Sequence, residues 1–221
     1  MTSRPEYQER PAWITGRAWA RGYLDAFELT RIAAWKSARG VAAITVNEPA
    51  EIEVRTRSAM SVIGSWRGRR AAEITADAGW CDWRQTANTA IGWMGGTGGE
   101  ASGLPALKGV LYPMATAILD ILDPDMWPAI DKWAAQTVFG KAPSRYSAAR
   151  YAAYARHLAA EGQRHWGPGL SIHELDQRAQ HASMNSDLPR LADYRTALIP
   201  VRRPQGRPVR GDARPGASTA A

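Results

Sequence analysis

Asp131 has the sequence context most suggestive of chemistry. It ends a Pro-containing loop, WPAID, and begins a helix-forming segment, DKWAAQTVFG. An aspartate at a helix N-terminus caps the first backbone N–H groups, and the helix dipole favours its negative charge. Such a fixed anion can stabilise positive charge that develops in a reaction and can orient an attacking water. Asp131 is therefore the candidate catalytic residue, with a simple helix cap as the alternative.

A turn precedes this loop in the stretch LKGVLYP, residues 107–113. Gly109 tolerates the left-handed conformation of a turn, and Pro113 suits the first turn of a following helix because its missing N–H is harmless there. Backbone N–H groups beside a helix N-terminus can bind a phosphate. The candidate phosphate-binding residues of this hairpin are Lys108, Gly109, Val110, Leu111, Tyr112 and Pro113.

Three further candidates lie together near the end of an N-terminal helix, namely Trp35, Lys36 and Arg39. An aromatic ring can stack on a base, and a cation can hold a phosphate. The alternative is an ordinary basic helix C-terminus with Trp35 in the core. Trp127, in the loop before Asp131, is a fourth candidate for the wall of a base pocket.

The spacing of apolar residues predicts a chain made of helices. Helical periodicity recurs throughout, and no segment alternates convincingly with the period of a strand. Capping boxes at Asp25/Glu28 and Ser171/Glu174 mark two helix starts, and Asp123-Pro124 marks a helix end. We expect about nine helices, over residues 25–39, 52–63, 69–77, 87–94, 104–108, 113–122, 144–164, 171–184 and 188–198, with a further one starting at Lys132. The predicted fold class is all-α.

The chain divides into three predicted parts. Residues 1–20 form an N-terminal arm, residues 21–199 a helical domain, and residues 200–221 a disordered Arg/Pro/Gly-rich tail. The net charge is +7, and five arginines against one aspartate place +4 of it in the tail from residue 201. A basic chain of this kind favours an anionic partner such as nucleic acid.

Several classes of protein and site are excluded or disfavoured. The single cysteine, Cys81, excludes an intrachain disulfide and any four-cysteine metal or iron–sulfur site. The four histidines, at residues 157, 165, 173 and 181, are spaced too widely for one metal site and are expected at the surface. No apolar stretch approaches the ~20 residues that span a membrane, and the N-terminus has no signal core. We therefore expect a cytoplasmic protein without a metal or organic cofactor.

The hairpin and the loop together resemble the helix–hairpin–helix DNA glycosylase superfamily. The signature of that family is a Leu-Pro-Gly-Val-Gly hairpin, a helix, a Gly/Pro loop and an essential aspartate. Leu107, Gly109 and Val110 match the hairpin, and Pro128 and Asp131 match the loop and its carboxylate.

The spacing and the N-terminal half extend the resemblance. In bifunctional members a Schiff-base lysine holds the position of Pro113, and the eighteen residues from there to Asp131 are the spacing of the family. A narrower likeness, through a Trp-Lys-Ser-x-Arg segment at residues 35–39 and through Pro113, joins the chain to uncharacterised bacterial members.

The resemblance implies a glycosylase-like helical domain that binds double-stranded DNA and is associated with the nucleoid. Because Pro113 has no amine, it implies a monofunctional enzyme that hydrolyses the N-glycosidic bond of a flipped damaged or modified base. The resemblance also implies a monovalent cation at the hairpin. Leu111 replaces the second hairpin glycine there, and we expect it to weaken the binding of phosphate or of that cation. Two alternatives stay open: a non-catalytic DNA-binding module, and an all-α interaction protein of a defence or mobile-element system.

Overall fold

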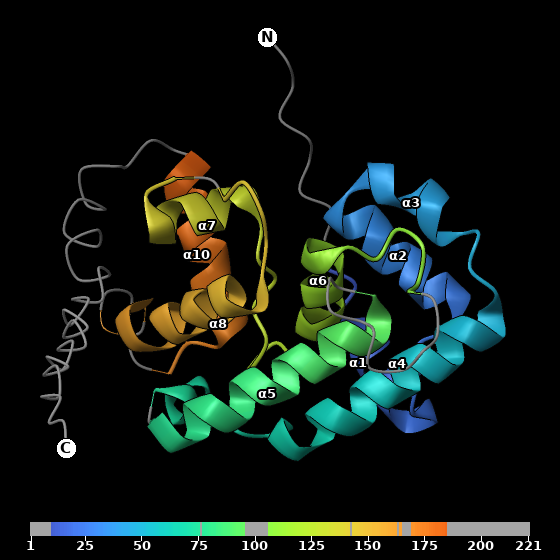
Figure 1. The fold of residues 1–221 in the computed structure, drawn as a ribbon, viewed down its shortest axis with the longest axis horizontal. Helices are drawn as coiled ribbons and strands as arrows, with labels where there is room; N and C mark the ends of the chain where they lie inside the picture. Colours follow the sequence, from blue (N-terminus) through green and yellow to red (C-terminus); the bar gives the residue numbers. More distant parts are fainter. Residues whose placement is uncertain are drawn as a thin grey trace, which may run out of the picture.

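The computed structural model describes residues 10–75, 77–95, 106–141, 143–162, 164 and 169–184. Within these ranges the chain is helical and contains no strand, so the predicted all-α class is confirmed. Figure 1 shows the nine α-helices of the described residues, which are α1 (Trp13–Arg21), α2 (Ala26–Lys36), α3 (Ala38–Ile44), α4 (Pro49–Ile63), α5 (Asp77–Met94), α6 (Tyr112–Leu122), α7 (Lys132–Phe139), α8 (Ala148–His157) and α10 (Ile172–Met184).

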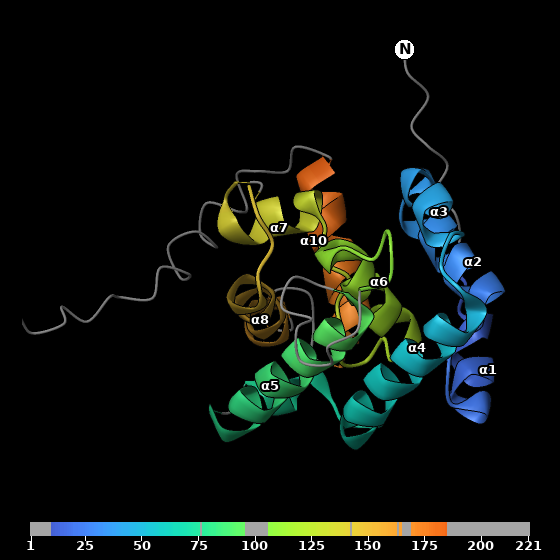
Figure 2. The same ribbon diagram turned by 45° about the vertical axis from the view of Figure 1, so that its right-hand side comes forward.

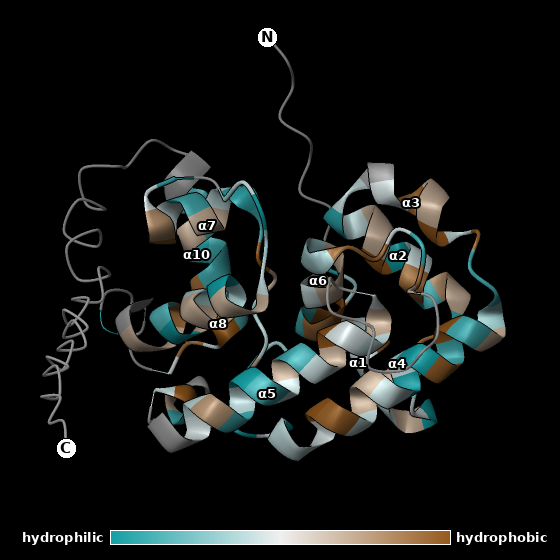
Figure 3. Cartoon of the chain, viewed as in Figure 1, coloured by the Kyte–Doolittle hydropathy of each residue, from teal (hydrophilic) through white to brown (hydrophobic). Residues whose placement is uncertain are grey.

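Helix α6 is the centre of the fold. It lies between α2 and α3 on one side and α7, α8 and α10 on the other (Figures 1 and 2). Every residue of α6 except Pro113 is buried. The small residues Ala115 and Thr116 are buried as fully as the large apolar residues of this helix. Small side chains there allow neighbouring helices to approach α6 closely from more than one side. In Figure 3 hydrophobic residues run along α6, whereas α5 shows hydrophilic residues.

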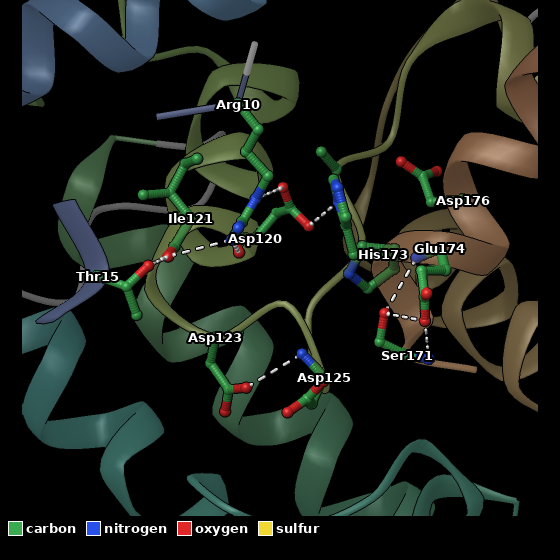
Figure 4. A network of polar contacts seen from close by, with 12 residues as sticks. Arg10, Thr15, Asp120, Ile121, Asp123, Asp125, Ser171, His173, Glu174 and Asp176 are labelled. Atoms are coloured by element: carbon green, nitrogen blue, oxygen red, sulfur yellow. Dashed lines mark hydrogen bonds and ion pairs between the residues drawn. The ribbon is translucent and has the colours of Figure 1, made fainter. Parts of the chain in front are cut away.

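The C-terminal end of α6 is capped by side chains from the N-terminal part of the chain. Arg10 donates to the carbonyl oxygen of Asp120 at 2.6 Å, and Thr15 donates to that of Ile121 at 2.6 Å (Figure 4). Trp19 donates to the carbonyl oxygen of Leu122 at 2.8 Å. These bonds satisfy carbonyl groups that a helix end leaves without an intrahelical partner. In the described part of the predicted N-terminal arm, residues 10–20, α1 begins at Trp13 and packs on the end of α6.

The Asp120 side chain links three parts of the fold in the same region. Its carboxylate is fully buried and lies 3.4 Å from Arg10 Nε and 2.7 Å from His173 Nδ1, which comes from α10. Two of the histidines predicted at the surface are thus not surface residues. His173 is mostly buried against Asp120, and His157 is buried in α8.

Local capping signals specify where two of the helices begin. Both capping boxes form, with Asp25 and Glu28 starting α2 and Ser171 and Glu174 starting α10. Helix α2 ends at Lys36 instead of Arg39, because Ser37 is extended and a separate helix, α3, follows.

Four further predicted helices differ in extent. The predicted helix 87–94 is the C-terminal part of α5, which begins at Asp77. The predicted helix 144–164 starts at α8, where Ser147 caps the N–H of Arg150, and a π-helical turn (Leu158–Gly162) follows it. The predicted helix 69–77 is a short 3-10 helix (Ala71–Ile74). In the predicted helix 104–108, the described residues 106–108 are not helical. The predicted last helix, 188–198, and the tail, 200–221, lie outside the described residues.

An aromatic cluster fills the part of the core where α5, α6 and α8 meet. Trp83 of α5 stacks on Trp127 with ring centroids 4.9 Å apart, and Tyr151 of α8 lies 5.5 Å from Trp83. The Tyr112 ring of α6 completes the cluster, 6.0 Å from Tyr151. No helix in the described ranges is both long and apolar enough to cross a membrane.

Candidate functional site

Asp131 is the N-cap of α7, as its position in the sequence predicted. Its Oδ1 accepts hydrogen bonds from the N–H groups of Trp133 and Ala134, both at 2.8 Å. Its Oδ2 is directed elsewhere and lies 4.0 Å from Nζ of Lys36, the last residue of α2. The side chains of Lys36 and Asp131 are 14% and 19% exposed, so both reach solvent. One carboxylate oxygen therefore holds the helix, and the other pairs with a cation from a distant segment.

The loop that carries Asp131 is held on both sides. The N–H of His173 donates to the carbonyl oxygen of Pro124 at 3.0 Å, and the Tyr151 hydroxyl donates to that of Pro128 at 3.1 Å. Lys36 Nζ donates to the carbonyl oxygen of Ala129 at 3.3 Å. Contacts from three helices therefore fix the position of the carboxylate, as a preorganised site requires.

The other pocket candidates are distributed differently from the prediction. Trp127 is fully buried in the aromatic cluster, so it belongs to the core and offers no face to a base. Trp35 is partly buried and packs against the core. The side chain of Arg39 lies outside the described residues. Of the four candidates, Lys36 alone is shown in contact with Asp131.

Asp176 of α10 is a buried acid that interacts electrostatically with Asp131 and Lys36. Sequence analysis missed it. The Tyr154 hydroxyl donates a hydrogen bond to its carboxyl group. Burial raises the pKa of Asp176 well above its usual value; Asp131 raises the pKa further, and Lys36 lowers it. Asp131 also adds to the effect of burial in raising the pKa of Tyr146, so Tyr146 lies near the same carboxylate. Sequence spacing alone does not reveal this cluster, because its members come from separate helices.

The side chain of Asp123, the first residue of the loop, makes the stability of the fold depend on pH. Burial, followed by repulsion from Asp125, raises the pKa of Asp123 to about 6 from 3.8. A carboxyl whose pKa is higher in the folded state stabilises the fold fully below pH ~4 and loses that contribution as pH rises through 6. Asp123→Asn removes this titration. We expect its stability relative to wild type to rise by about 3 kcal/mol between pH 4 and pH 7.

Urea unfolding of both proteins at several pH values measures this difference. Asp82→Asn, at an exposed position on α5, is the control and should show a constant difference from wild type. Parallel pH curves for Asp123→Asn and wild type would contradict the assignment.

The 107–113 hairpin forms a tight turn ahead of α6. Gly109 has φ +79°, and the N–H of Val110 bonds to the carbonyl oxygen of Leu107 at 3.2 Å. Lys108 and Leu111 are exposed, Leu111 by 69%, whereas the side chains of Val110 and Tyr112 are buried. The Tyr112 ring completes the aromatic cluster, so its backbone N–H and not its side chain is the part that can meet a phosphate. Pro113 is half-buried in the first turn of α6.

The backbone N–H groups of the hairpin are only partly available to a ligand. Within the described part of the chain, those of Gly109, Leu111 and Tyr112 donate no hydrogen bond. The N–H of Lys108 is occupied, because it donates to Oδ1 of Asn47 at 2.7 Å. Three backbone donors beside the start of α6 remain, which is enough to hold a phosphate oxygen.

Asn47 fixes the hairpin to the end of α3 and was also missed by sequence analysis. Its amide nitrogen donates to the carbonyl oxygens of Ile44 at 2.7 Å and Lys108 at 2.9 Å. The turn approaches α3 so closely that a Cβ on Gly109 would lie 2.8 Å from Cβ of Ala43. Glycine is thus required at residue 109 for space as well as for its positive φ.

Metal binding has little support among the described side chains. No group of three or more His, Cys, Asp and Glu residues in those ranges is arranged to hold a metal ion. At the hairpin, the carbonyl oxygens of Leu107 and Lys108 already accept hydrogen bonds. The monovalent cation expected at that turn stays a prediction.

Comparisons of the chain with protein-family models, with curated proteins and with solved structures find no match. Its function is therefore inferred from the residues of the hairpin and of the Asp131 site.

Proposed function

We propose that this chain is a helix–hairpin–helix glycosylase-like protein that binds double-stranded DNA and hydrolyses the N-glycosidic bond of a flipped nucleotide. The observation that carries the proposal is the Lys36–Asp131 pair, in which one carboxylate oxygen is fixed by α7 and the other faces a cation at 4.0 Å. Both side chains reach solvent, and the loop that holds them is fixed by other helices.

The proposed reaction uses Asp131 as an electrostatic and basic group. Positive charge develops on the sugar as the bond from C1′ to the base nitrogen breaks, and Oδ2 of Asp131 stabilises that charge. Water attacks C1′ and gives up a proton, and the base leaves with a proton, so the product is an abasic site. Lys36 orients the carboxylate and attracts the phosphate next to the flipped nucleotide. Because Pro113 has no amine, we propose hydrolysis without a covalent intermediate.

The hairpin supports the proposed DNA partner. Lys108 is exposed, and the N–H groups of Gly109, Leu111 and Tyr112 have no acceptor within the described residues. A cation and backbone donors together recognise phosphate without reading the base sequence.

The experiment that tests the proposal is a screen of duplexes that each carry a different damaged, modified or mismatched base. Heat and alkali cleave the strand wherever a base has been removed. Cleavage that requires both the protein and the alkali step supports a monofunctional glycosylase. Absence of cleavage across a broad panel would contradict catalysis.

A non-catalytic DNA-binding module is the second candidate. The observation that favours it is the capping role of Asp131, because two N–H bonds give this residue a structural purpose without catalysis. Salt-sensitive DNA binding without base removal would select this candidate.

Lys108→Glu is expected to weaken DNA binding because it reverses the charge next to the proposed phosphate site. A lysine that contacts phosphate contributes nearly equally to the affinity for every DNA sequence. Its loss should therefore reduce the magnitude of the slope d log K/d log [salt] by about 1. Fluorescence anisotropy with two unrelated duplexes at several salt concentrations measures this. Arg84→Glu, an equal charge reversal at an exposed residue of α5, is the control. Equal affinities for Lys108→Glu and wild type at low salt would remove the hairpin from the interface.

A further inference from the structure

Trp133 is a large aromatic side chain left open to solvent next to Asp131. It is the second residue of α7 and is 39% exposed. Its own N–H is bonded to Oδ1 of Asp131 at 2.8 Å, so its backbone is fixed relative to the carboxylate. Trp127, the tryptophan that the sequence suggested for this role, is fully buried. The aromatic surface available beside Asp131 is therefore that of Trp133.

Lys132 accompanies this ring. Its Nζ lies 4.4 Å from the centroid of the Trp133 ring, and the side chain is exposed. A tryptophan with an adjacent cation offers a stacking face and a phosphate contact within one turn of helix.

The surrounding chain has the charge that an anionic partner requires. From residue 132 to residue 160 there are five basic residues and no acidic one: Lys132, Lys141, Arg145, Arg150 and Arg156. The first three are exposed. The exposed cations Lys132, Lys141 and Arg145 thus follow Asp131 on α7 and in the loop leading to α8.

We propose that Trp133 and Lys132 form a stacking platform for an unpaired nucleobase of DNA, with Lys132 on the neighbouring phosphate. The proposal rests on the proposed function, and it adds the side chain that holds a base out of the duplex. Stacking of one base on an aromatic side chain changes affinity by roughly 5- to 150-fold. This gain in affinity should be specific for DNA in which a base is already unpaired, because a paired base has no free face for Trp133.

Two fluorescein-labelled duplexes of the same sequence test the platform, one fully paired and one with a single bulged thymine. Trp133→Ala is expected to lower affinity for the bulged duplex by about tenfold or more and affinity for the paired duplex by less than about twofold. Trp133→Phe should restore most of the loss, because a phenyl ring also stacks. The backbone N–H that caps Asp131 is kept in both variants, and thermal melting verifies that they fold.

Trp13→Ala is the matched control. Trp13 is 44% exposed and also carries a cation over its ring, Arg17 at 5.4 Å, but it lies on α1. An equal loss in Trp13→Ala, an equal loss on both duplexes in Trp133→Ala, or no loss in Trp133→Ala would each overturn the platform. In any of those cases, the proposed function still stands if wild type binds both duplexes and Lys108→Glu weakens that binding. If wild type binds neither duplex, the platform and the proposed function both fail.

Discussion

Asp131→Asn is expected to lower the rate of base excision by ~10²-fold or more, the loss typical of a preorganised electrostatic group. The amide keeps an oxygen for the N–H groups of Trp133 and Ala134, so the cap of α7 and the fold should persist. The variant loses the charge that faces Lys36 and the developing positive charge on the sugar. DNA binding should persist or tighten, because an anion near the phosphates is removed. Single-turnover excision on the best substrate from the lesion panel measures the effect.

Asp125→Asn, at an exposed position of the same loop, is the control for this variant and should keep full activity. Equal excision by Asp131→Asn and wild type would refute the catalytic role. Borohydride provides a separate test of the mechanism. A covalent complex trapped through Lys36, whose amine lies 4.0 Å from Asp131, would replace the monofunctional reaction with one that passes through an imine.

Asp120→Ala should lower the free energy of unfolding by about 3–5 kcal/mol, because removing one partner of a buried charged network leaves the others uncompensated. Its carboxylate is fully buried between Arg10 and His173. Urea unfolding measures the loss. Asp82→Ala, on the exposed side of α5, should change stability by less than about 0.5 kcal/mol. A loss below about 1 kcal/mol for Asp120→Ala would mean that the network contributes little to stability.

Helices, capping boxes and the cap at Asp131 could be predicted because their signals are local. The boxes at Asp25/Glu28 and Ser171/Glu174 each involve residues three positions apart, and both form. Asp131 likewise uses donors within three residues of itself. These contacts depend on short-range backbone geometry, which the order of residues specifies directly.

The parts that escaped prediction depend on contacts between distant segments. Lys36 meets Asp131 because the ends of α2 and of the Pro-containing loop converge, and Asn47 holds a hairpin 61 residues away. The same holds for the two tryptophans. Trp127 and Trp133 lie only six positions apart, yet stacking on Trp83 buries the first, whereas the second is exposed on α7.

The hydrogen bonds from Arg10, Thr15 and Trp19 to the end of α6 join residues that are 103 to 110 positions apart. A ribosome adds roughly 5–20 residues per second, so the N-terminal helix waits about 5–20 s for α6 to be synthesised. During that interval the buried face of α1, which includes Ile14, has no α6 to cover it. The nascent chain therefore exposes the apolar face of α1 until α6 has been synthesised.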